Sequence, residues 1–489
     1  MKVSELIREN PLVVKCVGAA DTDVRMLTAD SRTAQDVTDG LFFCISGANF
    51  DGHRFAPQMV KKGCTVLVCE REVPDAGAKA QIVVSDVRAA MALIAAAFYG
   101  HPERKLRLIG VTGTKGKTTT TYLLKAILET AGMKCGLIGT TGCMIGSEHL
   151  KSELTTPDPI DMFSMLDHMV REGVQAVCME VSAHALALRK LTGMSFEAAA
   201  YTNLSLDHLD FFGTMEKYRD TKKLLFTSGL ARNAAFNLDD ESTAEVMRGV
   251  TIPHVTYAIS EPADLYARDI EITERGVSFE LNLRKLHAVQ VHLRMTGMFN
   301  VYNSLAAAAM AMIMGVELDT IKRGLESIAN VPGRIETLET QTPYRVILDY
   351  SHSPDALENI LRAVRAFTRG RLIVLFGCGG DRDKGKRPVM GRIAGEKADF
   401  SILTSDNPRH EDPMEILREI EAGIAPTGGE YITIENRREA IAYALSHGEN
   451  GDVIVLAGKG HETYQDIAGV KHPFDEKKVV MELLARTDE

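Results

Sequence analysis

A glycine-rich segment with two lysines and several threonines is the part of the chain best suited to chemistry. It reads Gly113-Thr114-Lys115-Gly116-Lys117-Thr118-Thr119. Backbone N–H groups in such a loop can surround a phosphate, the Lys117 ammonium can offset its charge, and the Thr118 hydroxyl can reach Mg²⁺. We therefore predict that all seven residues, 113–119, bind the phosphates of ATP.

The flanking sequence predicts the strand and the helix that position this loop. Leu106–Val111 is a short apolar run of strand length, and after the loop leucine and isoleucine recur at helical spacing. Gly132 follows where a helix C-terminus favours glycine. The standard P-loop spacing would require glycine in place of Val111, so the loop is a shorter variant. An ordinary glycine-rich turn is the alternative interpretation.

Potential metal ligands follow two other predicted strands. Glu180 lies near the end of the apolar run Ala176–Val181, and His208 lies in an Asp-His-Leu-Asp sequence after Ala198–Thr202. Carboxyl ends of parallel strands meet at one edge of a sheet, so both side chains are expected near the ATP loop. A carboxylate there suits Mg²⁺. The alternatives are a solvated strand-end acid and a surface Asp-His pair.

The apolar patterns predict an α/β protein with three domains. A chain of 489 residues is too long for one core. Breaks occur around His101-Pro102 and Pro332-Gly333. We predict a small N-terminal α/β domain over residues 1–102, a central P-loop-type domain with a parallel sheet over 103–332, and a C-terminal Rossmann-like, doubly wound domain over 333–489. Within the central domain, the alternation in Arg268–Leu293 predicts antiparallel hairpins.

Composition and charge narrow the class of protein. Hydrophobic residues make up 45% and charged residues 25%, as in ordinary globular proteins, and the net charge of −10 argues against broad nucleic-acid binding. No apolar run is long enough to span a bilayer, and the chain opens on a mixed, charged segment. The eight scattered cysteines suit free thiols in a reducing cytosol. We expect a cytoplasmic monomer without nucleic-acid or membrane partners.

Motifs along nearly the whole chain resemble those of the Mur ligases, the ATP-dependent amino-acid ligases of peptidoglycan assembly. Each segment is weak evidence alone, but together they are specific. The matching segments are Asp30-Ser31-Arg32, Asp51-Gly52-His53, Gly113–Thr119, Thr155-Thr156-Pro157, Glu180-Val181-Ser182, Asn203–Asp210, Gly297–Asn303, Pro332-Gly333-Arg334, Asp349-Tyr350-Ser351-His352, Gly379–Arg387, Asp406-Asn407-Pro408-Arg409 and Gly458–Glu462.

The resemblance changes the interpretation of two adjacent lysines. Taken alone, Thr221–Phe226 is a basic turn of a helix whose lysines face water. In Mur ligases a lysine at the position of Lys222 is carbamylated by CO₂, and a carbamate, unlike an ammonium, can hold two Mg²⁺ ions. Lys223 is the alternative, which the spacing of the flanking aromatic residues disfavours. The implied metal ligands are Thr118, Glu180, His208 and carbamylated Lys222, and the implied catalytic residues are Lys117, Glu180, His208 and Lys222.

Further residues complete the nucleotide and UDP-substrate sites by the same resemblance. The first group matches positions near the nucleotide: Asn300, Asn303, Arg334 and Asp349. Taken singly, the asparagines could be helix caps, the arginine could start a helix and the aspartate could be a strand-end acid. The second group matches positions that contact the UDP substrate: Ser31, Thr155, Thr156, Ser182 and Lys190. Arg189 is an alternative to Lys190.

The C-terminal motifs imply a pocket for the amino acid that is added. Its residues would be Arg382, Asp406, Asn407, Arg409, Gly458 and Glu462. The Asp-Asn-Pro-Arg sequence resembles that of enzymes adding meso-diaminopimelate, whose second carboxylate suits an arginine fork. A strand-end turn with an Asx cap is the alternative.

The resemblance implies that the chain joins UDP-N-acetylmuramoyl-L-alanyl-D-glutamate to an amine of meso-diaminopimelate. ATP would convert the free carboxylate into an acyl phosphate, which the amine then attacks, with Lys117 and two Mg²⁺ ions offsetting the phosphoryl charge. The nearer alternatives are an L-lysine-adding Mur ligase and a ligase like folylpolyglutamate synthase. A P-loop nucleotide switch is the alternative that is not a biosynthetic enzyme.

Overall fold

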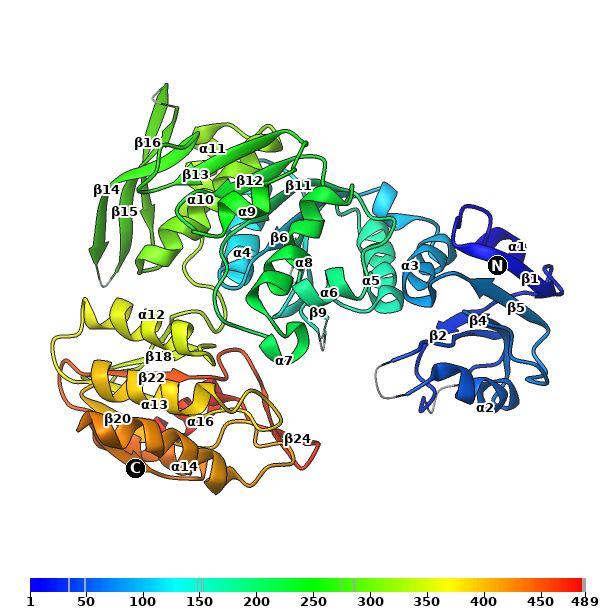
Figure 1. Cartoon of the computed structure of the whole chain (residues 1–489). Coiled ribbons are helices and arrows are strands. Elements are labelled where there is room, and N and C mark those ends of the chain that lie inside the picture. The colour runs from blue at the N-terminus through cyan, green and yellow to red at the C-terminus, as the bar shows by residue number, and fades with distance from the viewer. Residues whose placement is uncertain are drawn as a thin grey trace.

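The computed structural model describes residues 1–485 apart from 34–35, 48–49, 147, 151, 153, 274 and 285. This part of the chain forms three α/β regions, each built on its own sheet, and a short two-stranded hairpin. The N-terminal and C-terminal regions lie on different sides of the central one (Figure 1). The predicted α/β fold class is therefore confirmed.

The N-terminal region is a five-stranded sheet with helices packed against it. Its strand order is β1-β5-β4-β3-β2, parallel except for the β1–β5 pair. The alanine-rich helix α3 starts at an Asp86 cap, whose carboxylate accepts a hydrogen bond from the Ala89 N–H. The elements are α1 (Val3–Leu6), β1 (Val13–Gly18), β2 (Met26–Thr28), β3 (Gly40–Phe43), η1 (Gly52–Phe55), α2 (Ala56–Lys61), β4 (Cys64–Cys69), β5 (Ala80–Val84) and α3 (Val87–Phe98).

The central region is organised around strand β6, which leads into the glycine loop and helix α4. The sheet order is β16-β15-β14-β13-β12-β11-β6-β10-β7-β8-β9, with parallel pairing from β7 across to β14. The elements are η2 (Pro102–Arg104), β6 (Arg107–Thr112), α4 (Lys117–Thr130), β7 (Cys135–Gly139), β8 (Gly142–Ile145), β9 (Glu148–Leu150), α5 (Pro159–Arg171), β10 (Ala176–Glu180), α6 (Ala183–Ala187), β11 (Phe196–Tyr201), α7 (Leu209–Phe212), α8 (Met215–Thr227), β12 (Ala234–Asn237), α9 (Thr243–Met247), β13 (His254–Ala258), β14 (Leu265–Thr273), β15 (Gly276–Leu283), β16 (His287–Leu293), α10 (Met298–Ile313) and α11 (Leu318–Ser327).

Both faces of the central sheet are buried, which explains the continuous apolar runs of its strands. Ile109 and Val111 of β6 pack with α4, α10 and α11, whereas Leu108 faces the core on the side of α3 and α5. The predicted hairpins are confirmed, since β14, β15 and β16 pair antiparallel. Residues 274 and 285, between these strands, lie outside the described residues.

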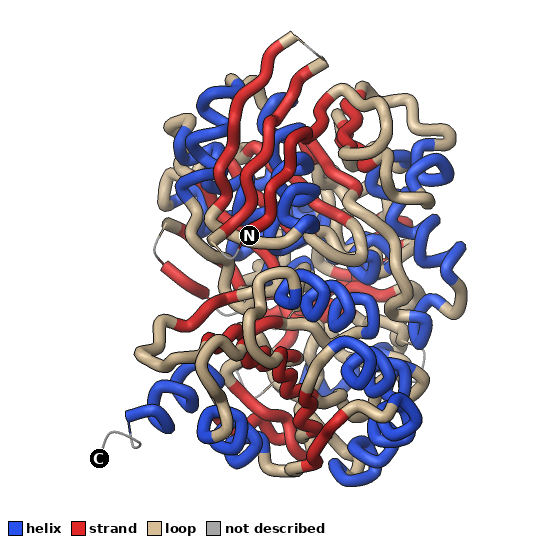
Figure 2. Tube along the Cα trace, turned by 90° about the vertical axis from the view of Figure 1, so that its left-hand side faces the viewer, coloured by secondary structure: helices blue, strands red, loops and turns tan. Residues whose placement is uncertain are grey.

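The C-terminal region is the predicted doubly wound sheet. Its order is β17-β18-β22-β19-β20-β21, parallel except for β17. Helices α12, α13 and α14 pack on one face and α15 and α16 on the other, so helices flank these strands on both sides in Figure 2. The elements are β17 (Glu336–Leu338), β18 (Arg345–Asp349), α12 (Pro354–Arg365), β19 (Leu372–Phe376), α13 (Lys386–Lys397), β20 (Phe400–Leu403), α14 (Pro413–Ile424), η3 (Ala425–Thr427), β21 (Glu430–Thr433), α15 (Arg437–Ser446), β22 (Val453–Ala457), β23 (Tyr464–Ile467), β24 (Val470–Pro473) and α16 (Glu476–Ala485).

None of the helices in the described ranges has both the length and the apolar character needed to cross a membrane.

Candidate functional site

The glycine loop joins the end of β6 to the start of α4, as the sequence predicts. Gly116, the residue before the helix, has a φ of 87°, a backbone conformation that favours glycine. Gly113 has a φ of 149°, and a Cβ there would lie 1.9 Å from the Thr202 hydroxyl oxygen. Gly113 therefore lets the chain pass close to Thr202, at the end of β11, and Gly116 lets it turn into the helix.

The Lys117 side chain folds back across this loop. Its ammonium donates hydrogen bonds to the carbonyl oxygens of Gly113, at 2.9 Å, and Thr114, at 3.0 Å. Burial lowers the pKa of Lys117 to about 8, so the group remains charged at pH 7. A protonated lysine with carbonyl partners only is available to a bound phosphate.

A cavity of about 710 Å³ opens over the loop, and the central and C-terminal regions both contribute to its lining. This volume is within the usual range for small-ligand sites. The central region contributes loop residues 114–119, Glu180, His208 and the α10 side chains Phe299, Tyr302 and Asn303. The C-terminal side contributes Arg334, Asp349, Tyr350 and His352.

Among the described residues, three hydrogen bonds join the C-terminal region to the central one at this cavity. Arg334 donates to the Thr118 hydroxyl at 3.1 Å, and the Lys115 ammonium donates to the Ser353 hydroxyl at 2.7 Å. The His461 Nε2–H donates to the Thr140 carbonyl at 3.1 Å. Two of these contacts use loop residues, so a phosphate in the loop would lie beside both regions.

Glu180 is a buried carboxylate at the edge of the cavity. Its side chain is almost inaccessible, and its two oxygens accept hydrogen bonds from the Thr140 N–H and hydroxyl at 2.9 and 3.0 Å. No ion pair to Glu180 occurs in the described part of the chain. A buried carboxylate without an ion-pair partner in the described ranges, in the same cavity as the Thr118 hydroxyl and the phosphate loop, fits a hard cation such as Mg²⁺.

The possible metal ligands around Glu180 are of mixed type and are not a cluster of acidic side chains. The described ranges contain no group of three or more His, Cys, Asp or Glu side chains arranged to hold a metal. Any ion at Glu180 would therefore need other oxygen donors, such as Thr118 and substrate phosphates. His208 lines the same cavity, and burial lowers the pKa of its imidazole below the usual value, which favours the neutral form that binds metals.

Lys222, rather than Lys223, lies against the loop. The Lys222 side chain is 1% exposed, donates to the Gly113 carbonyl at 3.0 Å and lies 3.9 Å from the centroid of the Tyr218 ring. Burial, together with the nearby Lys117 charge, lowers the pKa of Lys222 well below its usual value. Lys223 points elsewhere and donates to the Glu245 carbonyl at 3.0 Å. The neutral amine that carbamylation requires is therefore favoured at Lys222.

The two asparagines predicted near the nucleotide have different surroundings. Asn303 lines the cavity, and a Cβ on Gly116 would lie 2.4 Å from its Oδ1. Asn300 is not in the cavity wall. Its amide donates to the Thr296 carbonyl at 2.8 Å, and its Oδ1 accepts from Asn303 at 3.1 Å. Asn300 thus supports Asn303 from behind. Asp349 lines the cavity and accepts backbone hydrogen bonds from Ile335 and Ser351.

Most residues predicted for the UDP substrate cluster beside Glu180. Thr155 lines the cavity and shares a hydrogen bond with Thr140 at 3.0 Å. The Thr156 hydroxyl contacts the Glu180 carbonyl at 2.8 Å and the Ser182 hydroxyl at 3.1 Å. Ser31 is not part of this cluster, because it follows β2 in the N-terminal region.

The structure distinguishes Lys190 from Arg189, the two basic residues considered for contact with the UDP substrate. Lys190 is buried, pairs with Asp158 at 2.8 Å and donates to the Thr156 carbonyl at 3.4 Å. Arg189 is 63% exposed and lies 3.4 Å from Asp86. Lys190 is therefore the residue that reaches the threonine cluster.

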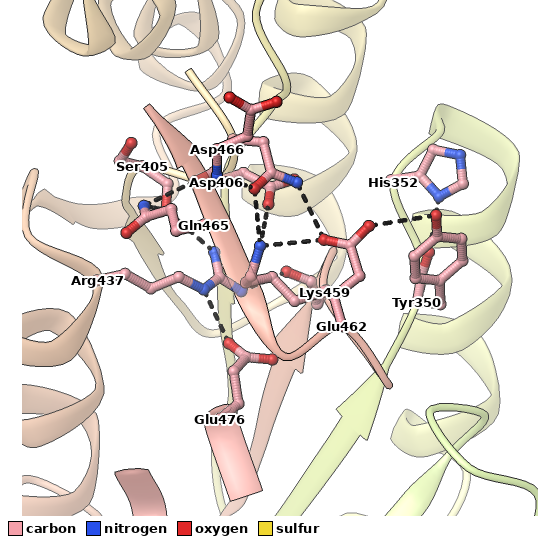
Figure 3. A network of polar contacts seen from close by, with 12 residues as sticks. Tyr350, His352, Ser405, Asp406, Arg437, Lys459, Glu462, Gln465, Asp466 and Glu476 are labelled. Atoms are coloured by element: carbon pink, nitrogen blue, oxygen red, sulfur yellow. Dashed lines mark hydrogen bonds and ion pairs between the residues drawn. The ribbon is translucent and has the colours of Figure 1, made fainter. Parts of the chain in front are cut away.

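The predicted amino-acid pocket is a charged network beyond Tyr350. Asp406, Asn407 and Glu462 surround the Lys459 ammonium at 3.3, 3.0 and 3.1 Å. Figure 3 shows Lys459 among the labelled side chains of this network, with Asp406 and Glu462. Gly458, with a φ of 114°, turns the chain between β22 and this lysine.

The two predicted pocket arginines lie outside the network. Arg409 has a φ of 50°, and its guanidinium donates to the Gly380 carbonyl at 2.6 Å. Arg382 is exposed and donates to the Asp381 carbonyl at 3.2 Å. The structure thus brings Asp406, Asn407 and Glu462 together, places Arg409 two residues from Asn407, and leaves Arg382 on a neighbouring surface loop.

Lys459, Tyr350 and Thr140 are among the residues of the site that were not predicted from the sequence. Lys459 and Tyr350 lie inside matched motifs, in Gly458–Glu462 and Asp349-Tyr350-Ser351-His352, so the motifs themselves carried the signal. Thr140 organises Glu180, but a threonine after an apolar run has no distinguishing pattern.

Together the fold and the site define a P-loop-type nucleotide-binding protein whose phosphate cavity is completed by a second α/β region. Three family descriptions match the chain: "Mur ligase family, catalytic domain" over residues 23–99, "Mur ligase middle domain" over 111–311 and "Mur ligase, glutamate ligase domain" over 333–460. The chain belongs to the Mur ligase family.

Relatives similar over their full length carry one activity in their names. The UDP-N-acetylmuramoyl-L-alanyl-D-glutamate–2,6-diaminopimelate ligase 1 of Clostridium acetobutylicum is 42% identical over 487 residues, which is 99% of each chain. The ligase of that name from Geobacillus thermodenitrificans is 44% identical over 94% of each chain. A solved structure of such a ligase is 30% identical, with a TM-score of 0.69 over 100% of this chain and 99% of its own.

Proposed function

We propose that this protein is an ATP-dependent ligase that joins UDP-N-acetylmuramoyl-L-alanyl-D-glutamate to meso-2,6-diaminopimelate in peptidoglycan precursor synthesis. The observation that carries the proposal is the shared cavity, which is lined by a phosphate loop and by Tyr350 of the C-terminal region, whose hydroxyl lies 3.5 Å from Glu462 of the acidic network. An enzyme that phosphorylates one substrate and transfers it to another requires this adjacency. The names of relatives at 40–44% identity supply the substrates.

In this reaction a phosphoryl group moves from ATP to the free carboxylate of the UDP substrate. The loop N–H groups and Lys117 hold the transferring phosphate, and Arg334 approaches it from the C-terminal side. The amine of the acceptor then attacks the acyl phosphate, phosphate leaves and an amide forms. When bound, Mg²⁺ would offset phosphoryl charge, and Thr118, Glu180, His208 and a carbamylated Lys222 are the residues that fit it.

We also propose that the three α/β regions are separate domains, divided near residues 102 and 332, in the cytoplasm. Each of the three matched family segments falls inside one of these ranges. The N-terminal domain would hold the UDP end of the substrate through Ser31, and the threonine cluster with Ser182 and Lys190 would hold its peptide end. The eight cysteines are free thiols, which suits a reducing compartment.

A phosphate-release assay with the UDP-dipeptide and a panel of amino acids tests the activity. We expect brisk release only when the UDP-dipeptide and diaminopimelate are both present. Faster release with L-lysine would identify the lysine-adding variant instead. Release from ATP alone, unaffected by any amine, would indicate a nucleotide switch and contradict the ligase.

Arg409 tests the choice of acceptor within this proposal. Replacing Arg409 by alanine removes the fork expected to bind the second carboxylate, so the KM for diaminopimelate should rise roughly 30- to 100-fold with little change in kcat. Steady-state kinetics at varied diaminopimelate measure this. His410→Ala is the matched control, because His410 is 70% exposed and pairs with Asp381. An unchanged KM in Arg409→Ala would contradict the assignment.

A further inference from the structure

The Lys459 ammonium is fully enclosed within the predicted acceptor pocket. Its side chain is 0% exposed, and it follows β22 at the carboxyl end of the C-terminal sheet. An ammonium has three donors, and all three are used, by Asp406, Asn407 and Glu462. Figure 3 shows these contacts converging on the lysine. Lys459 therefore has no hydrogen-bond donor left for a substrate.

Charge balance explains why a lysine is needed there. Asp406 is buried and Glu462 is largely buried, so two carboxylates share one enclosed space. Although burial alone would raise it, the pKa of Asp406 lies below its usual value because Lys459 and Arg437 are close. Arg437 is itself neutralised by Glu476, at 2.8 Å, and both are fully buried. Lys459 is thus the cation left to balance the pair.

The lysine also fixes the orientation of Asn407 and, through it, of Glu462. The Asn407 Oδ1 accepts from Lys459 and from the Asp466 N–H, at 2.9 Å, so its amide nitrogen must face Glu462. That nitrogen donates to the Glu462 Oε2 at 3.0 Å, where Lys459 also donates. Oε2 is therefore occupied by two donors. Within the described ranges, Oε1 has only the Tyr350 hydroxyl, 3.5 Å away.

Backbone and side-chain hydrogen bonds through Asp466 and Asn407 link the backbone of Arg409 to Glu462. The Arg409 N–H donates to the Asp466 carbonyl at 3.0 Å, and the Asp466 N–H donates to Asn407. An acceptor whose far carbon carries both a carboxylate and an ammonium can offer the carboxylate to the Arg409 guanidinium and the ammonium to the Glu462 Oε1. Two separate charges of the acceptor thus match two separate groups of the protein.

We propose that Lys459 is a positioning residue that holds the Glu462 carboxylate in the rotation in which Oε1 receives the far ammonium of the acceptor. This inference rests on the proposed function, because it takes diaminopimelate as the acceptor. It assigns to Lys459 the preference for an acceptor with that second ammonium. Lys459 itself does not touch the substrate.

The test compares two acceptors of equal length on one set of variants. Diaminopimelate carries the far ammonium, whereas 2-aminopimelate keeps the far carboxylate and lacks only that group. In Lys459→Met we expect kcat/KM for diaminopimelate to fall about 100-fold and that for 2-aminopimelate less than about threefold. Lys459→Arg should recover part of the lost selectivity. Lys477→Met is the control, since Lys477 is 60% exposed and pairs with Glu336 in the same domain.

The experiment distinguishes a purely structural role of Lys459 from failure of the proposed ligase function. If Lys459 served only folding, both acceptors would lose kcat/KM equally and the KM for ATP would rise, which would overturn the proposal. If Lys459→Met does not fold, Glu462→Gln, which is isosteric, must show the same selective loss, and an equal loss there would also overturn it. Failure of the proposed function appears separately, as absence of diaminopimelate-dependent phosphate release in the wild-type protein.

Discussion

Replacing Lys222 by alanine is expected to lower kcat about 1000-fold, because the substitution removes the carbamate that we propose as an anionic metal ligand at the edge of the phosphate site. The side chain is 1% exposed and lies against the Gly113 carbonyl, and burial keeps the pKa of its amine low. A neutral amine attacks CO₂, forms an N–C bond and loses a proton, which gives a carbamate with two oxygens. Steady-state phosphate release at saturating substrates measures the effect.

Lys223 provides the matched control one residue further along α8. Its ammonium contacts the Glu245 carbonyl, away from the loop, so Lys223→Ala should retain kcat within about twofold. The carbamate itself has a readout apart from activity. Labelling with ¹³C-bicarbonate should give a carbamate carbon signal in the wild-type protein and in Lys223→Ala, but not in Lys222→Ala. A fully active Lys222→Ala enzyme would rule out this role.

The loop and its two flanking elements could be predicted because they depend on local pattern. β6, the glycine turn and α4 follow from apolar spacing and from glycines at positive φ, and Gly132 does have a φ of 89° after the helix. Each of these features is encoded within about 15 neighbouring residues, a range in which sequence periodicity is informative.

The parts that could not be predicted depend on contacts between distant segments. Arg334 reaches Thr118 across 216 positions, and nothing near either residue indicates the pairing. Asn300 and Asn303 look equivalent in sequence, but their different places on α10 put only Asn303 in the cavity wall. Lys459 follows a strand like many surface lysines, and only tertiary packing shows that it is enclosed by acids.

Replacing Lys117 by methionine should lower kcat for phosphate release about 1000-fold, since the transferring phosphoryl group loses its nearest preorganised cation. In the structure the ammonium spans the loop between the Gly113 and Thr114 carbonyls, and its pKa of about 8 leaves it charged at pH 7. Methionine has similar length and keeps the apolar stem packed, so loss of folding is not expected. Rapid-quench measurement of ADP formation with the UDP-dipeptide checks the phosphoryl step directly.

A second lysine on the same helix separates this effect from general damage to α4. Lys125 pairs with Glu129 at 2.6 Å and does not line the nucleotide cavity, so Lys125→Met should leave ADP formation within about twofold of the wild-type rate. If Lys117→Met slowed only the later, amine-dependent step and left ADP formation fast, Lys117 would act after phosphoryl transfer. The loop would then hold the product phosphate rather than activate the carboxylate, and the division of roles between the two regions would have to be reversed.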